Sequence, residues 1–120
     1  MRLVLPVPPS ANQYWKTTRE GRIYVSTEAK DYKTEVGWLC VNVEPLKGRV
    51  IVSIWVYRAK RRGDLDNFQK ILLDALQGYA FDNDSQIVEL HSYLEDDPRN
   101  PRVEVEVNSV PSLMLPLFGS

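Results

Sequence analysis

The chain has 120 residues, of which 43% are hydrophobic and 26% are charged, a balance that excludes a disordered chain and indicates one globular domain. Its formal net charge of −1 excludes a globally basic protein, so contacts with a polyanion would need local clusters of basic residues. Cys40 and His91 are its single cysteine and single histidine, which excludes an intrachain disulfide and a zinc site of these residue types and fits a reducing, cytosolic setting. We also expect no membrane-spanning segment and no signal peptide, because apolar stretches are short and the first residues lead into prolines.

The first half of the chain predicts a strand, a loop, a short strand and a helix. Residues 2–7 form a short β-rich run that prolines end, as a strand that leads into a loop does. Residues 10–22 are a polar and aromatic loop, and residues 23–26 add a short strand. Ser26 or Thr27 is a suitable N-cap for a helix that runs to about Asn42.

The second half predicts a strand, a helix and two more strands. Residues 49–57 are almost continuously apolar, which indicates a strand buried on both faces. After a basic turn, residues 64–79 carry apolar side chains at spacings of three and four, as an amphipathic helix does. Residues 86–94 and 102–107 are two further strands, and strict alternation in the second leaves one of its faces exposed.

The order strand, helix, strand, helix, strand, strand indicates an α/β (α+β) fold, in which a small mixed sheet is flanked by two helices in one layered domain. We expect this domain to span residues 1–108, with residues 109–120 as an extended apolar tail.

Acidic side chains gather at the start of the predicted helix 64–79 and in the loop that follows it. On that helix Asp66 and Lys70 share one side, and Asp64 lies at the cap. The loop supplies Asp82 and Asp84, and both groups can meet at the same edge of the sheet. Carboxylate oxygens placed there suit Mg²⁺, which polarises phosphoryl oxygens and activates water.

A simpler interpretation is that these aspartates only stabilise a helix. Carboxylates in a first turn cap free amides and interact favourably with the helix dipole, and Asp66 with Lys70 is an ordinary i,i+4 pair. Taken alone, the sequence DLDN favours this interpretation by about two to one. A calcium-binding EF-hand loop fits less well, because the positions that need glycine and glutamate hold other residues.

The order of the motifs PPSANQYW, RRGDLDNFQKILLDAL and FDNDSQI resembles the RusA family of Holliday junction resolvases, over residues 3–107. The resemblance implies a small endonuclease in which three aspartates bind Mg²⁺, with Mn²⁺ as a substitute, and in which a lysine assists hydrolysis. On the matching positions the metal ligands and catalytic acids are Asp64, Asp66 and Asp84, and the catalytic lysine is Lys70.

Two positions depart from the family pattern. The family usually has two adjacent acids in the loop, where this chain has Asn83 and Asp84, so we expect Asp84 rather than Asp82 to bind the metal and leave a contribution of Asp82 open. Gly63 stands where the family often has an arginine, and the neighbouring arginines can compensate for it.

Basic residues beside the acids are candidates for DNA contacts. A polyanion held by them would place its phosphate at the metal, although a solvated turn has the same composition. The loop 10–22 interleaves aromatic and cationic residues, which suits an opened junction with exposed bases, and its aromatics can equally pack on the core. The candidate DNA-binding residues are Arg58, Lys60, Arg61, Arg62, Asn12 and Lys16.

The tail contains the sequence SLMLPLF, in which regular structure is blocked by Pro111 before it and Pro116 within it. It resembles the bacterial sliding-clamp binding motif, with Ser112 in place of the preferred glutamine, and such a peptide docks in apolar pockets of another protein. Packing within the domain or at a dimer seam is the alternative. The candidate partner-binding residues are Leu113, Leu115, Leu117 and Phe118.

The leading hypothesis is therefore a Mg²⁺-dependent endonuclease that resolves four-way DNA junctions in a bacterial or phage-infected cell. Two symmetric nicks need two sites, so we expect a homodimer with two-fold symmetry. A junction-binding module without nuclease activity is one alternative, and metal-dependent nicking distinguishes it from the hypothesis. A structural protein with well-capped helices is the other, and absence of junction affinity would favour it.

Overall fold

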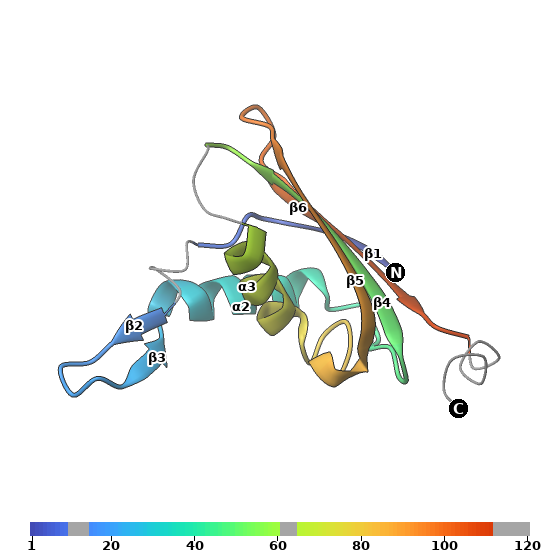
Figure 1. Ribbon diagram of the computed structural model, residues 1–120, viewed down its shortest axis with the longest axis horizontal. Helices are drawn as coiled ribbons and strands as arrows, with labels where there is room; N and C mark the ends of the chain where they lie inside the picture. Colours follow the sequence, from blue (N-terminus) through green and yellow to red (C-terminus); the bar gives the residue numbers. More distant parts are fainter. Residues whose placement is uncertain (10–14, 61–64, 112–120) are drawn as a thin grey trace.

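The computed structural model describes residues 1–9, 15–60 and 65–111, with only the backbone described for residues 15, 16 and 25. A four-stranded sheet carries two helices on one of its faces, and a separate two-stranded hairpin extends from the helical side (Figure 1). None of the helices in these ranges has the length and apolar content needed to cross a membrane. The elements in chain order are β1 (Arg2–Leu5), β2 (Trp15–Thr17), β3 (Ile23–Val25), α2 (Thr27–Leu39), β4 (Val50–Arg58), α3 (Leu65–Leu76), the 3₁₀ helix η1 (Asp84–Gln86), β5 (Ile87–Asp96) and β6 (Arg102–Ser109).

The main sheet has the strand order β1-β6-β4-β5 and is mixed. β6 pairs antiparallel with both β1 and β4, whereas β4 and β5 run parallel. A parallel pair needs a crossover connection, and α3 supplies it by carrying the chain back across one face of the sheet (Figure 1). The predicted α/β (α+β) domain, with a small mixed sheet and two helices, is confirmed.

β4 shows how the sheet divides the molecule into a covered face and an open face. Its side chains alternate between fully buried and partly buried positions, and Trp55 is one of the partly buried ones. The prediction that this strand is buried on both faces is therefore wrong, because both helices pack on the same side of the sheet (Figure 1). The fully buried side chains of β4 are Val50, Val52, Ile54 and Val56.

The helix α2 begins where the sequence predicted. Ser26 is its N-cap, and the Ser26 Oγ accepts a hydrogen bond from the Ala29 N–H at 3.1 Å, which satisfies one of the free amides of the first turn. The helix ends at Leu39, short of the predicted end near Asn42. The apolar pattern of the sequence therefore did not locate the end of this helix.

The helix α3 buries an apolar stripe against the sheet, as its spacing predicted. It ends at Leu76 rather than at Tyr79, because Gly78 follows with a φ of 92°. This left-handed conformation favours glycine and stops a helix. The buried residues of α3 are Phe68, Ile71, Leu72, Ala75 and Leu76.

The segment predicted as a polar loop contains the strand β2, which pairs antiparallel with β3. Ile23 and Tyr24 are 73% and 49% exposed, and no residue of these two strands belongs to the core of the described part of the chain. The hairpin therefore projects from the helical layer (Figure 1). A strand of three residues in polar surroundings has too little alternation to be recognised in a sequence.

Candidate functional site

Asp66, Lys70 and Asp74 lie on successive turns of α3, and all three are exposed. Their four-residue spacing places them in one row on the helix surface, as the sequence predicted. The end of this row is fixed to the other helix, because the Lys33 Nζ donates a hydrogen bond to the Asp74 carbonyl oxygen at 3.1 Å. The helix thus presents a cation between two carboxylates on a surface that the sheet does not cover.

The loop between α3 and β5 folds into a tight turn that includes η1. The Asn83 Oδ1 accepts a hydrogen bond from the Ser85 N–H at 2.9 Å. In return the Gln86 Oε1 accepts from the N–H groups of Asp82, at 2.8 Å, and of Asn83, at 2.9 Å. This reciprocal capping box defines the backbone of the turn and leaves Asp84 exposed.

The turn and α3 share a cavity of about 250 Å³. Lys70, Asp74 and Gln77 line it from the helical side, and Asp84 lines it from the turn. The Asp84 N–H donates to the Gln77 Oε1 at 3.4 Å, a long hydrogen bond that connects the turn with the end of α3. The structure thus brings the predicted residues Lys70 and Asp84 together, whereas Asp66 lies one turn away along the helix and is not part of this lining.

The two acids of the turn have different surroundings. The Asp82 carboxylate forms an ion pair with Lys47 and does not line the cavity. The Asp84 carboxylate makes no hydrogen bond or ion pair with another residue of the described ranges. This difference supports Asp84 rather than Asp82 as a metal ligand, which stays a prediction.

Carboxylate oxygens are the ligands that Mg²⁺ prefers, and Asp66 and Asp84 offer them from two consecutive elements of the fold. Asp64, the third predicted ligand, lies outside the described residues. Within residues 1–9, 15–60 and 65–111, no three His, Cys, Asp or Glu side chains form a metal-binding group. The donor chemistry fits a hard cation, and the complete ligand set stays a prediction.

The predicted DNA-binding residues fall partly within the described ranges. Arg58, at the end of β4, forms an ion pair with Asp96, and 18% of its side chain is exposed, so a phosphate would have to share this guanidinium with Asp96. Lys60 is exposed, and Lys16 lies in β2 with its side chain outside the description. Also outside the described residues are Asn12, Arg61, Arg62, Leu113, Leu115, Leu117 and Phe118.

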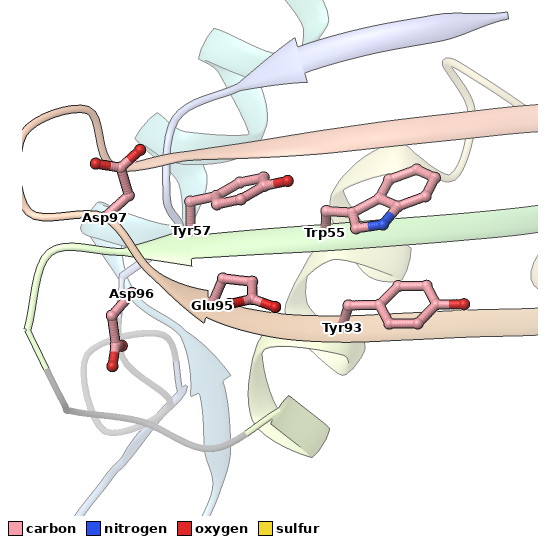
Figure 2. A pocket seen from close by; sticks show the side chains of 6 residues that line it. All are labelled: Trp55, Tyr57, Tyr93, Glu95, Asp96 and Asp97. Carbon is pink, nitrogen blue, oxygen red and sulfur yellow. The ribbon is translucent and has the colours of Figure 1, made fainter.

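A second cavity, of about 420 Å³, lies on the open face of the sheet where β4 and β5 end (Figure 2). Trp55 and Tyr93 stack there with ring centroids 5.7 Å apart and an interplanar angle of 13°. Tyr57 contacts the guanidinium of Arg102, whose carbon lies 3.9 Å from the ring centroid. The acidic part of the lining, which disfavours a phosphate backbone, consists of Glu95, Asp96 and Asp97.

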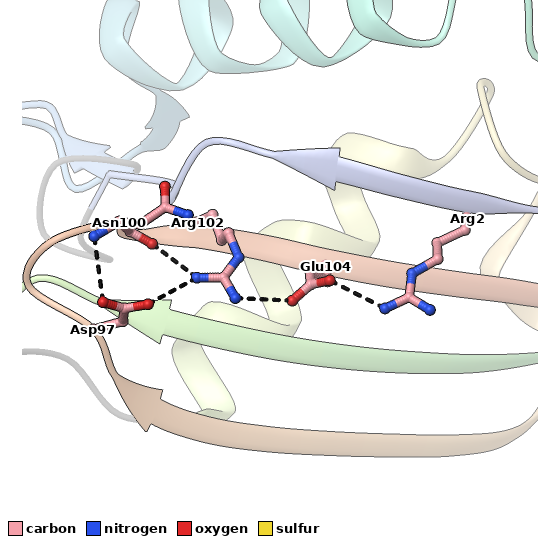
Figure 3. Close-up of polar contacts among 5 residues, drawn as sticks. All are labelled: Arg2, Asp97, Asn100, Arg102 and Glu104. Atoms are coloured by element: carbon pink, nitrogen blue, oxygen red, sulfur yellow. Dashed lines mark hydrogen bonds and ion pairs between the residues drawn. The ribbon is translucent and has the colours of Figure 1, made fainter.

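A network of ion pairs crosses the same open face (Figure 3). Arg102 donates to the Asp97 Oδ2 at 3.0 Å and to the Glu104 Oε2 at 3.2 Å. Arg2 donates to the Glu104 Oε1 at 3.1 Å. The hydrogen bond from Arg2, with the positive charge of Arg102 beside it, holds the pKa of Glu104 below its ordinary value, so these acids are compensated within the fold.

Two glutamines, one in the first cavity and one in the turn beside it, were not predicted from the sequence. Gln77 lines the cavity, and Gln86 holds the turn. Asn83 followed three residues later by Gln86 is a capping-box pattern, which is a signal that could have identified Gln86. Gln77 is an ordinary polar residue at a helix end, and no pattern distinguishes it.

The family model and the individual proteins that this chain resembles carry the same name, RusA. The family model described as Endodeoxyribonuclease RusA matches residues 6–108 of the chain. The crossover junction endodeoxyribonuclease RusA of Escherichia coli strain K12 is 32% identical over 117 residues, which cover 90% of this chain and 93% of that protein. The proteins of the same name from Shigella sonnei strain Ss046 and Enterobacteria phage 82 are 31% and 30% identical over the same shares of both chains.

Proposed function

The chain belongs to the RusA endodeoxyribonuclease family, and on this basis we propose that it is a structure-selective endonuclease that resolves four-way (Holliday) DNA junctions. Its reaction is the hydrolysis of phosphodiester bonds, in the service of DNA recombination and repair. The alignment covers 93% of the Escherichia coli relative, so the likeness extends over nearly all of that protein rather than over a shared motif.

One observation supports this proposal best. Lys70 and Asp84 belong to different motifs and different elements, yet they line one cavity. An acid and a cation at one depression suit a phosphate that is attacked beside a bound metal. The N-cap of η1 is Asn83, so helix capping does not account for the place of Asp84 at this cavity.

We propose that Asp64, Asp66 and Asp84 hold Mg²⁺, for which Mn²⁺ can substitute. When bound, the ion supplies Lewis-acid stabilisation of the phosphate that is cleaved. Lys70 places a positive charge where negative charge develops on that phosphate. Because Asp66 and Asp84 come from a helix and from a turn, these two elements must keep a fixed relation for the site to work.

Junction DNA is the proposed substrate, and a second copy of the chain is the proposed partner. Two opposed nicks need two sites, and a homodimer with a two-fold axis matches the symmetry of the junction. Basic residues after β4, namely Arg58, Lys60, Arg61 and Arg62, would contact phosphates, with Asn12 and Lys16 as further contacts. These contacts position the DNA without reading its sequence.

The tail, residues 109–120, is a proposed ligand of a bacterial sliding clamp. Titration of the synthetic peptide into purified clamp by calorimetry tests this, and absence of heat at high peptide concentration would remove it. The cytoplasm of a bacterial or phage-infected cell is the proposed location, because it contains both the junctions and the clamp.

Cleavage of a labelled four-way junction tests the main proposal. We expect paired nicks with Mg²⁺, none in EDTA, and none on a linear duplex of identical sequence. The variant Asp66→Asn should abolish cleavage while junction binding persists or improves, because a negative charge near the phosphates is removed. Tight binding by the wild type without nicks would indicate a non-catalytic junction-binding module instead.

A further inference from the structure

We infer that Gln86, assisted by Gln77, is a positioning residue that fixes the carboxylate of Asp84 relative to Lys70. This inference rests on the proposed function, in which Asp84 is a metal ligand. Neither glutamine offers an atom to the phosphate in this role, since each acts through the backbone of the turn. Metal ligands need such support. Substitution of the residues that orient a ligand through hydrogen bonds commonly lowers metal affinity by about 10- to 100-fold.

The need for support follows from where Asp84 lies. It opens η1, which has only three residues, and its side chain is exposed. A short surface turn is mobile unless its backbone groups are tied down. The Asp84 carboxylate itself has no partner within the described part of the chain, so its place is decided by the backbone of the turn.

Gln86 supplies the ties with every hydrogen-bonding group of its amide. Its Oε1 accepts from the N–H groups of Asp82 and Asn83, at 2.8 and 2.9 Å. Its Nε2 donates to the carbonyl oxygens of Leu46, at 2.9 Å, and Gly48, at 2.7 Å. The amide thus connects the turn to the segment that precedes β4, which lies about 40 residues earlier in the chain.

None of the residue types that resemble glutamine could make all four of these hydrogen bonds at position 86. Glutamate has the acceptor but lacks both donors, asparagine is one methylene shorter, and methionine has the shape without the hydrogen bonds. A merely structural capping residue needs only to accept from the amides of the turn. The two donors of Gln86 reach outside the turn, and this is what makes the position of the turn in the fold depend on one side chain.

Gln77 completes the connection on the side of the helix. It follows the last residue of α3, lines the cavity with Lys70 and Asp84, and its Oε1 accepts the Asp84 N–H at 3.4 Å. The turn is thereby linked both to the segment before β4 and to the helix that carries Lys70. The long distance of this contact makes Gln77 the weaker of the two ties.

The test compares Gln86→Met and Gln77→Met with Gln69→Met as the matched control. Gln69 lies on α3 and accepts a hydrogen bond from the Ser92 Oγ at 2.7 Å, so its substitution also removes a contact between elements, away from the cavity. The readouts are the Mg²⁺ concentration for half-maximal junction cleavage, hydrogen exchange of the turn amides, and the thermal midpoint in EDTA.

For Gln86→Met we expect the half-maximal Mg²⁺ concentration to rise by about 10- to 100-fold, with cleavage recovering at high Mg²⁺. The amides of Asp82 and Asn83 should exchange faster. Gln77→Met should raise the Mg²⁺ requirement less. Gln69→Met should lower the thermal midpoint and leave the Mg²⁺ requirement unchanged.

Two results would overturn the inference. One is an unchanged Mg²⁺ requirement in Gln86→Met, and the other is an equal rise in Gln69→Met, which would mark a general loss of stability. If Gln86→Met does not fold, Gln86→Glu serves in its place, because it keeps the acceptor and loses both donors, although it also adds a negative charge. A wild type that binds junctions without cleaving them would instead remove the proposed function, so the two failures are distinguishable.

Discussion

The cavity beside α3 and the cavity on the open face of the sheet are both lined with acids, but their acids are compensated differently. On the open face, Asp97 is paired with Arg102, within a network that also holds Glu104. Beside α3, the Asp84 carboxylate has no partner in the described ranges, and Lys70 lines the same cavity. A carboxylate paired with arginine already has its charge compensated within the fold. A carboxylate that is positioned only through its backbone can still bind a cation.

The comparison teaches that the number of acids does not locate a metal site. The open face has the larger cavity and the larger set of carboxylates. Two of its three acids, Asp96 and Asp97, are paired with arginines, and its aromatic rings are stacked with one another or with a guanidinium. What distinguishes the cavity beside α3 is the support behind Asp84, which comes from hydrogen bonds to backbone rather than to the carboxylate.

The sharpest way to break this comparison is to neutralise one acid in each region. Asp84→Asn should lower junction cleavage by about 1000-fold, because a bound metal contributes several kcal/mol of transition-state stabilisation. Asp97→Asn should leave cleavage near the wild-type rate. Both rates are measured at saturating enzyme on the same labelled junction, and equal losses in the two variants would contradict the assignment.

Substitutions on the two faces of β4 should differ in how much they lower the free energy of unfolding. Ile54 is fully buried on the face covered by the helices, so Ile54→Ala should lower the free energy of unfolding by about 2–5 kcal/mol. Ile51 is partly buried on the open face, and Ile51→Ala should cost about 1 kcal/mol. Urea unfolding followed by circular dichroism measures both, and equal costs would mean that something covers the open face.

Lysines offer a third comparison, between the cavity and the outer side of the turn. Lys70→Met should lower cleavage by about 100-fold without changing junction affinity in EDTA, because the charge acts on the developing transition state. Lys47 pairs with Asp82 outside the cavity, and Lys47→Met should retain cleavage. Filter binding and single-turnover cleavage separate the two effects, and a large loss in Lys47→Met would implicate Asp82 in the site.

Much of the fold could be predicted from the sequence because β-branched alternation and apolar spacing are local signals. The strand β6 and the helix α3 followed from them almost unchanged. The open face of β4 did not, because Trp55 and Tyr57 are as apolar in the sequence as the buried residues that alternate with them. Which side a helix covers is decided by the crossover between β4 and β5, and no residue pattern within the strand states it.

The candidate site, like the fold, has a part that could be predicted from the sequence and a part that could not. The row of Asp66 and Lys70 on one helix is a matter of spacing and could be predicted. The support of Asp84 by Gln86 could not, because two of its hydrogen bonds end on the carbonyl oxygens of Leu46 and Gly48. Those groups belong to every residue type, so the sequence does not mark them as partners of a distant glutamine.

The smallest expected effect is the dependence on pH of the network on the open face. Hydrogen bonding to Arg2, with the charge of Arg102, holds the folded-state pKa of Glu104 below its ordinary value of 4.5. A carboxyl whose pKa is depressed by folding contributes stability above its unfolded-state pKa and loses it as the pH falls through the folded-state pKa. The difference in thermal midpoint between the wild type and Glu104→Gln should therefore be largest at neutral pH and shrink in acid below 4.5.

Arg2→Gln should show a smaller difference with the same trend, and high salt should reduce both because this network is partly exposed. A difference that stays constant down to strong acid would mean that Glu104 acts by packing, and the open face would then lose its character as a region of compensated charge.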